Sequence, residues 1–168
     1  MAEFKDALPY VLLNEGGWAD DPMDPGGATM HGITFGVAQQ YGIKTEDELR
    51  NITPELVERI YRSGYWRFND LVSQRVATKI FDMCVNMGLR TGIRLAQETV
   101  NSYGATIADD GIWGDETKNA INAMPEAQML DGLCHACVER YREIVMLRPA
   151  SSRFLKGWMA RAGKVPHA

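Results

Sequence analysis

Glu15 is the first residue of this sequence whose position suggests a chemical role, because it directly precedes a double glycine. The glycines are expected to end an amphipathic helix over residues 3–14. A carboxylate there faces the negative end of the helix dipole, which disfavours its charge. Val11, Leu12 and Trp18 supply apolar neighbours that act in the same direction. We therefore expect Glu15 to keep its proton near neutral pH, as a general acid must.

Asp24 and Thr29 complete this candidate catalytic set on the same short segment. Asp24 lies nine positions after Glu15 in a polar turn and is expected to stay ionised, and Thr29 offers a hydroxyl five positions later. A protonated acid, an ionised carboxylate and a hydroxyl that positions water suit the hydrolysis of a glycosidic bond. Asp20 and Asp21 compete with Asp24 for the second acidic role. A structural interpretation, with Glu15 at a helix end and the aspartates capping turns, fits the same residues.

The segment from residue 16 to residue 33 holds five glycines and two prolines, unlike the rest of the chain. Glycine and proline discourage helices and long strands, so we expect turns or a short β-hairpin there, with His31 as a structural residue. The remainder predicts helices over residues 3–14, 34–41, 53–63, 72–87, 91–103 and 125–147, with others beginning at Thr45, Asp115 and Ser152. Pro9 is expected to bend or delay the first helix. The predicted fold is mainly α, a single domain with a short turn-rich or hairpin segment after the first helix.

The composition excludes several classes of protein. With 45% apolar and 24% charged residues the chain is globular rather than disordered or coiled-coil. A net charge of −4 argues against a general nucleic-acid binder. The apolar runs are far shorter than the roughly 20 residues that span a bilayer, and the N-terminus lacks a classical secretory signal. We expect synthesis in a cytoplasm, no stable membrane insertion and a monomer.

Basic residues and cysteines are both concentrated late in the chain. Residues 138–168 hold seven basic and two acidic residues, a net charge of +5, which leaves −9 for the remainder. Such a basic stretch could favour an anionic polymer or membrane surface, or form a solvated helix face. Cys134 and Cys137 form a CxxC motif, but they share helical spacing with apolar residues and lack a second ligand pair. We interpret them as buried helical thiols rather than as a metal or redox site.

Aromatic side chains are candidates for lining a saccharide cleft, because sugars present flat C–H faces to rings. The substrate-binding candidates are Trp18, Tyr65, Trp66, Asn86, Tyr103 and Trp113. Asn86 could donate to an acetamido group or could end a helix before Gly88. For the rings, packing in the core is the alternative.

Two groups of sequence strings carry a family resemblance. The first is Glu15-Gly16-Gly17-Trp18, then Asp21-Pro22-Met23-Asp24-Pro25-Gly26-Gly27-Ala28-Thr29, then Gly32-Ile33-Thr34. It closely resembles the N-terminal motif of glycoside hydrolase family 108, which comprises bacterial and phage N-acetylmuramidases and usually has Tyr where Trp18 stands. The second group resembles the end of the family's catalytic region and the peptidoglycan-binding-like region usually fused to it. Its strings are residues 81–88, 96–98, 110–117 and 154–158.

The resemblance implies a lysozyme-like fold that hydrolyses the β-1,4 bond between N-acetylmuramic acid and N-acetylglucosamine in peptidoglycan. It maps the family's catalytic glutamate onto Glu15 and points to Asp24 and Thr29 as the groups that hold the attacking water in an inverting route. It also implies a catalytic region over residues 1–90 and a helical peptidoglycan-binding-like region over residues 91–168, packed into one compact domain. No metal or organic cofactor is expected.

The family includes phage endolysins that cause host lysis and bacterial muramidases that assist protein or toxin secretion, and we expect the first role. Either would act on peptidoglycan in the periplasm or cell wall. Three alternatives are a lytic transglycosylase, which also uses one glutamate, a wall-binding module without activity, and a Cys/His metal or redox protein.

Overall fold

The computed structural model describes residues 1–20 and 27–167, and within them the fold is mainly α, as predicted. The elements are α1 (Phe4–Glu15), β1 (Trp18–Ala19), β2 (Thr29–Met30), β3 (Ile33–Thr34), α2 (Phe35–Gln39), α3 (Glu46–Arg50), α4 (Pro54–Tyr65), α5 (Gln74–Met87), α6 (Leu89–Ser102), α7 (Asp115–Ala123), α8 (Glu126–Leu147), the 3-10 helix η1 (Pro149–Phe154) and α9 (Leu155–Ala162).

Four helices begin at a hydroxyl side chain that accepts a hydrogen bond from the first turn. Thr34, Thr45, Thr53 and Ser73 cap α2, α3, α4 and α5 in this way. Pro9 lies inside α1, which already begins at Phe4, so the proline does not delay the start of this helix. The predicted last helix is divided into η1 and α9, because the chain forms a 3-10 helix from Pro149 to Phe154 before the regular α-helix begins at Leu155.

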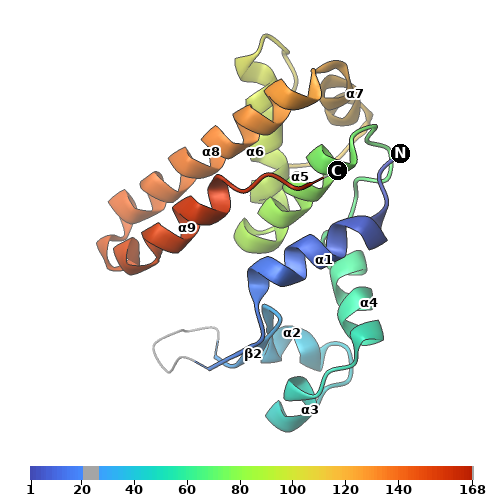
Figure 1. Ribbon diagram of the computed structural model, residues 1–168, viewed down its shortest axis with the longest axis vertical. Coiled ribbons are helices and arrows are strands. Elements are labelled where there is room, and N and C mark those ends of the chain that lie inside the picture. Colours follow the sequence, from blue (N-terminus) through green and yellow to red (C-terminus); the bar gives the residue numbers. More distant parts are fainter. Residues whose placement is uncertain (21–26, 168) are drawn as a thin grey trace.

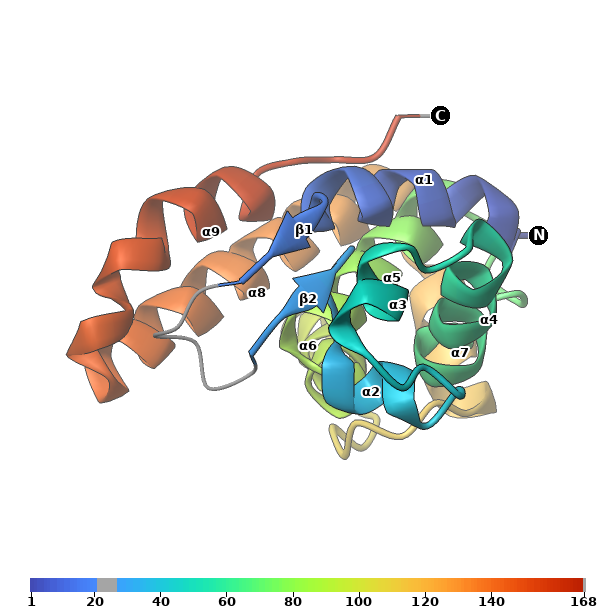
Figure 2. The same cartoon turned by 90° about the horizontal axis from the view of Figure 1, so that it is seen from below.

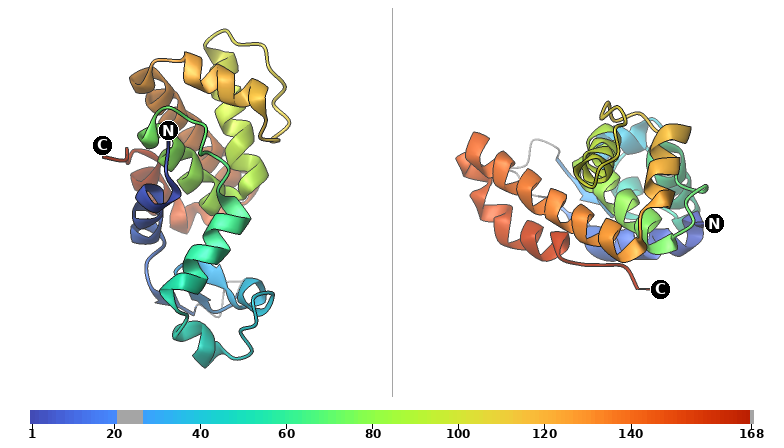
Figure 3. Two further views of the ribbon diagram at one scale, coloured as in Figure 1. Left: turned by 90° about the vertical axis from the view of Figure 1, so that its right-hand side faces the viewer. Right: turned by 90° about the horizontal axis from the view of Figure 1, so that it is seen from above.

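Helix α5 is the centre of the structure, and α1, α6 and α8 all pack against it (Figure 1). One cluster of buried apolar residues runs from the first helix to the last, so residues on both sides of position 90 share a core. The strands, α2 and α3 lie at one end of the molecule, and α7 lies at the other (Figures 1 and 3). No helix in the described ranges is long and apolar enough to cross a membrane.

The three short strands form an antiparallel sheet in the order β1-β2-β3, with Trp18 opposite Met30 and Thr29 between Ala19 and Thr34. His31 and Gly32 make the two-residue turn between β2 and β3, and both have positive φ (51° and 74°), as such tight hairpins require. The His31 ring Nδ1 lies 2.8 Å from the Gly16 carbonyl oxygen, and its backbone N–H donates to the Gly17 carbonyl. These two contacts fix the hairpin turn to the end of α1.

Helices α8 and α9 lie side by side and project away from the other helices (Figures 2 and 3). The C-terminal end of α9 returns to α1 and α5. There the Lys79 ammonium, which is 1% exposed, donates to the carbonyls of Arg161, Ala162 and Lys164. These bonds satisfy carbonyls at the helix end and hold α9 in register with α5.

Candidate active site

Glu15 ends α1, and its carboxyl group faces the hairpin turn. Gly16 follows it with a φ of 77°, which redirects the chain into β1. A Cβ on Gly32 would lie 3.0 Å from Glu15 Cδ and would overlap Oε2. The carboxyl group therefore occupies space that only glycine leaves open. The side chain is 14% exposed, so it is largely enclosed but still reaches solvent.

Arg161 from α9 and Asp82 from α5 meet Glu15 on its other side. Arg161 Nη2 donates to Glu15 Oε1 at 2.6 Å and to Asp82 Oδ1 at 2.9 Å, and Arg161 Nε donates to Asp82 Oδ2 at 3.3 Å. Arg161 is 12% exposed and Asp82 is 3% exposed. Burial opposes the charge of Arg161, but the two carboxylates raise its pKa above the ordinary value, so it stays cationic.

This environment differs from the apolar one that the sequence predicted for Glu15. Val11 is buried nearby in α1, but the nearest polar partner is a guanidinium, which stabilises negative charge. The spacing of residues near Glu15 carries no sign of Arg161, because the two are 146 positions apart. Asp82 does leave a signal, since it is the one charged residue in the apolar run from residue 80 to residue 85.

Two tyrosines stand close to the same carboxyl group. Tyr61 is buried and donates its hydroxyl to the His31 carbonyl, and Tyr65 tilts against it with ring centroids 5.9 Å apart. Burial raises the pKa of both phenols, and the charge of Glu15 adds to that effect, so both are neutral at ordinary pH. A cavity of about 60 Å³ lies between these rings, Gly32 and Thr34. The structure thus brings Tyr65, a predicted substrate-binding residue, beside Glu15.

The hairpin carries two more of the predicted residues. Trp18 lies on β1 with the Arg50 guanidinium 4.3 Å from its ring centroid. Thr29 lies on β2, and its hydroxyl donates to the Ala19 carbonyl at 3.5 Å. Asp24 and its competitor Asp21 lie outside the described residues. Asp20 is exposed directly after β1.

Comparisons with known proteins identify the family of this chain. The model of the family described as glycosyl hydrolase 108 matches residues 8–88, and a model described as a predicted peptidoglycan domain matches residues 91–163. A solved structure of Brucella abortus SagA is similar at 30% sequence identity and a TM-score of 0.76, over 95% of this chain and 88% of that one. The chain belongs to glycosyl hydrolase family 108. No curated protein matches it.

Family membership makes this chain a glycoside hydrolase that acts on peptidoglycan, as the sequence predicted. The two matched segments correspond to the Glu15 hairpin region with α1–α5 and to the helices α6–α9. Arg161 belongs to the second segment and Glu15 to the first, so the candidate active site of this hydrolase is completed across both.

Two of the predicted sugar-stacking rings lie in or against the core of the hydrolase. Trp66 is 4% exposed, donates its indole N–H to Asn69 and packs edge-on against Phe68. Trp113 packs edge-on against the same ring with centroids 4.8 Å apart. For Trp66 this burial favours the core alternative, because a covered ring has no face left for a sugar. Trp113 is partly exposed.

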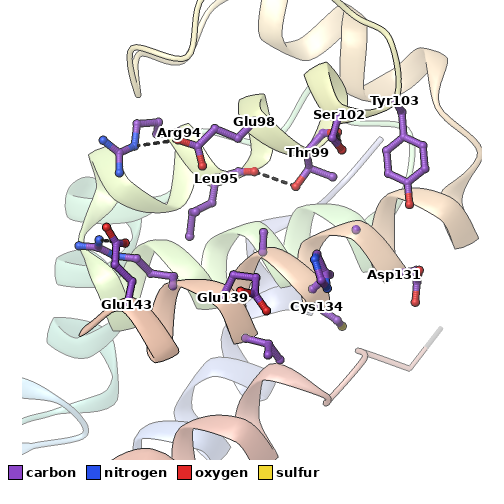
Figure 4. A pocket seen from close by; sticks show the side chains of 15 residues that line it. Arg94, Leu95, Glu98, Thr99, Ser102, Tyr103, Asp131, Cys134, Glu139 and Glu143 are labelled. Atoms are coloured by element: carbon purple, nitrogen blue, oxygen red, sulfur yellow. Dashed lines mark hydrogen bonds and ion pairs between the residues drawn. The ribbon is translucent and has the colours of Figure 1, made fainter. Parts of the chain in front are cut away.

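Tyr103 lies in a separate groove between α6 and α8. Its ring is 44% exposed and lines a cavity of about 780 Å³ (Figure 4). The charged residues lining this groove are mostly acidic: Glu98, Asp131, Glu139 and Glu143 against Arg94 and Arg140. None of the residues described above as contacts of Glu15 lines it, so the structure does not bring Tyr103 together with the candidate acid.

The CxxC cysteines lie on α8, where Cys137 is buried and Cys134 half-buried. Burial raises the pKa of the Cys137 thiol to about 12 and also raises that of Cys84. Within residues 1–20 and 27–167, no three His, Cys, Asp or Glu side chains are grouped as metal ligands would be. Cys137 is a buried packing group of the helix, as its spacing predicts, whereas Cys134 is only half-buried and lines the groove between α6 and α8.

Proposed function

We propose that this peptidoglycan hydrolase is an N-acetylmuramidase that cleaves the β-1,4 bond between N-acetylmuramic acid and N-acetylglucosamine, with Glu15 as its general acid. The observation that carries the proposal is the placement of the Glu15 carboxyl group, enclosed between the glycine of a hairpin turn and the Arg161–Asp82 pair. A general acid needs a fixed position and partial exclusion from water, and this arrangement supplies both.

The hydrogen bonds around Glu15 and Asp82 distinguish the two carboxyl groups. Among the described hydrogen bonds, Asp82 accepts from Asn14 Nδ2 and from two nitrogens of Arg161, whereas Glu15 accepts from one nitrogen of Arg161. One guanidinium balances only one of two carboxylates, so an excess negative charge is left when both are ionised. Asp82 therefore has more hydrogen-bond donors than Glu15, and we assign to Glu15 the role of delivering a proton to the leaving oxygen.

The attacking water is assigned to the hairpin side of the site. In our proposal Thr29 on β2 and the ionised Asp24 hold this water, which attacks the sugar on the face opposite Glu15 in an inverting reaction. Asp20 and Asp21 are the competing carboxylates. Trp18 and Tyr65 form walls of the sugar site, and their placement on β1 and at the end of α4 near Glu15 supports that role.

We assign the protein the biological role of a phage endolysin that acts as a monomer on periplasmic or wall peptidoglycan after synthesis in the host cytoplasm. Residues 1–90 form the catalytic region, and residues 91–168 hold the wall and complete the site through Arg161. The family model over residues 91–163 supports wall binding by the second region. A muramidase that assists secretion is the alternative role, and expression timing during infection distinguishes the two.

The test of the enzymatic proposal is digestion of purified peptidoglycan by wild type and Glu15→Gln. Loss of a general acid reduces turnover by about 10³-fold. Glu116→Gln on α7 is the matched control, because Glu116 is an exposed carboxylate and its variant should keep wild-type turnover. Equal digestion by wild type and Glu15→Gln would reject the role of Glu15.

Mass spectrometry of the released fragments identifies the reaction. A hydrolase leaves reducing muramic acid ends, heavier by one water than the 1,6-anhydro ends of a lytic transglycosylase. Anhydro products from wild type would replace our proposal with that alternative. Asp24→Asn, Asp21→Asn and Asp20→Asn, compared in the same assay, rank the candidates for the second carboxylate.

A further inference from the structure

A second layer of side chains continues from the Glu15 site, one helical turn along the same helices. Asn86 follows Asp82 by four residues on α5, and Trp158 precedes Arg161 by three on α9, so each pair shares a helix face. Tyr141 from α8 joins the second layer: its hydroxyl donates to Asn86 Oδ1 at 2.7 Å, and its ring stacks on Trp158 with centroids 5.1 Å apart.

A cavity of about 370 Å³ opens beside this second layer, between the end of α5, the last turns of α8 and the η1–α9 segment. Tyr141, Trp158 and the 42%-exposed Phe154 give it an aromatic wall, and Arg140 and Arg148 give it positive charge. No acidic residue lines it. We call this cavity the arginine pocket.

Both arginines have donors to spare. Arg140 donates from Nη1 to Glu143 Oε2 at 2.5 Å, and its Nε is buried with no hydrogen-bond partner in the described structure. The covered Nε is out of reach of a ligand, so the donors that Arg140 can offer to the pocket are the remaining N–H groups of its guanidinium. Arg148 is exposed at the C-terminal end of α8 and makes no ion pair with a described residue.

We propose that the arginine pocket binds a carboxylate of the peptide stem that peptidoglycan carries on its muramic acid residues. Arginine presents a planar fork of donors that matches a carboxylate, and aromatic walls suit the methyl groups of alanine residues. In intact peptidoglycan the lactyl carboxyl of muramic acid is bound in an amide, so the glycan offers only neutral groups to this pocket, whereas the stem offers several carboxylates. The inference rests on the proposed muramidase function, since it places the stem beside the bond that Glu15 acts on.

The position of the pocket supports this occupant. One helical turn is a rise of about 5.4 Å, which is comparable to the length of one sugar ring, so a stem on a muramic acid bound near Glu15 is within reach of the pocket. The α6–α8 groove has the larger volume, but its mostly acidic lining would repel the same carboxylates. The whole chain is also acidic, with a net charge of −4, so anion binding here has to come from local arginines.

The first experiment measures binding without catalysis. Wild type is titrated with the free stem peptide L-Ala-γ-D-Glu-meso-diaminopimelate-D-Ala by calorimetry, with the indole N–H signal of Trp158 followed by NMR. We expect saturable binding that shifts this signal, and about tenfold weaker binding by Arg148→Gln and by Arg140→Gln. Arg142→Gln is the matched control, because Arg142 lies on the same helix, is exposed and lines none of the cavities described above. It should bind as wild type does.

The second experiment compares kcat/KM on intact glycan strands and on strands freed of peptide by an amidase, in which each muramic acid loses the stem carboxylates and keeps only its own lactyl carboxylate. The ratio of the two should fall by about tenfold in Arg148→Gln and stay at the wild-type value in Arg142→Gln. An unchanged ratio in Arg148→Gln, or inorganic phosphate binding as tightly as the stem peptide, would overturn the inference. If the wild-type protein cleaves neither kind of strand but still binds the stem peptide at Trp158, the muramidase proposal is rejected and the stem-binding inference stands.

Discussion

Replacing Gly32 by alanine tests the placement of Glu15 through a residue that carries no functional group. The new Cβ would overlap Glu15 Oε2, and the carboxyl group would have to move by about 1 Å to regain ordinary contact. A misplacement of that size costs about 100-fold in rate. The φ of 74° adds about 1–2 kcal/mol of backbone strain, which lowers the melting temperature by about 2–4 °C for each kcal/mol.

Gly42→Ala separates the two effects. Gly42 has a φ of 96°, but a Cβ there would meet nothing within 4 Å. Both variants should lose similar stability in thermal unfolding, whereas only Gly32→Ala should lose about 100-fold in peptidoglycan turnover. If Gly32→Ala digests peptidoglycan as well as Gly42→Ala does, the carboxyl group is not held in the position that our reasoning requires.

Three further outcomes follow from the contacts of α9 and α8. Arg161→Lys should lower peptidoglycan turnover by about tenfold or more, because a lysine ammonium has one nitrogen and cannot bond both oxygens of Asp82 through two nitrogens while it reaches Glu15. Turnover equal to that of wild type would contradict this prediction. Lys79→Met should lower the free energy of unfolding in urea by about 3 kcal/mol or more, because it leaves the carbonyls of Arg161, Ala162 and Lys164 without their donor. An unchanged urea midpoint would show that α9 does not depend on these bonds. Burial raises the pKa of the Cys137 thiol from 9.0 to about 12 in the folded protein. The contribution of the neutral thiol to the free energy of unfolding is therefore complete below pH 9 and is lost as the pH rises to about 12. Cys137→Ala should therefore show a shallower fall in stability over that range, and an identical slope would argue against this burial.

The fold could be predicted because its signals are local. Thr45 and Thr53 lie directly before helical stretches, and their side chains make the capping bonds that this position implies. The double glycine after Glu15 ends α1, and the glycine-rich segment that follows contains the three short strands. Each of these helix and strand boundaries depends on residues a few positions apart, so the spacing of residue types in the sequence is enough to predict it.

The surroundings of Glu15 could not be predicted in the same way, because they are assembled from distant segments. Arg161 arrives from the last helix and Asp82 from the central one, and neither pairing is encoded by local periodicity. Near residue 15 the sequence shows a helix end and the apolar residues Val11, Leu12 and Trp18, and these features predict a protonated acid. The position of Trp66 could not be predicted either, because an aromatic residue after a helix can face solvent or the core. In the structure it packs in the core against Phe4, Phe68 and Phe81.

The most direct measurement of the central claim compares Glu15→Gln with wild type on two leaving groups. One substrate is the native disaccharide linkage, and the other is an activated aryl β-glycoside of N-acetylmuramic acid, whose phenolate departs without a proton. If Glu15 is the general acid, the variant should lose about 10³-fold in kcat/KM on the native linkage and less than about tenfold on the aryl glycoside. An equal loss on both substrates would contradict proton donation by Glu15.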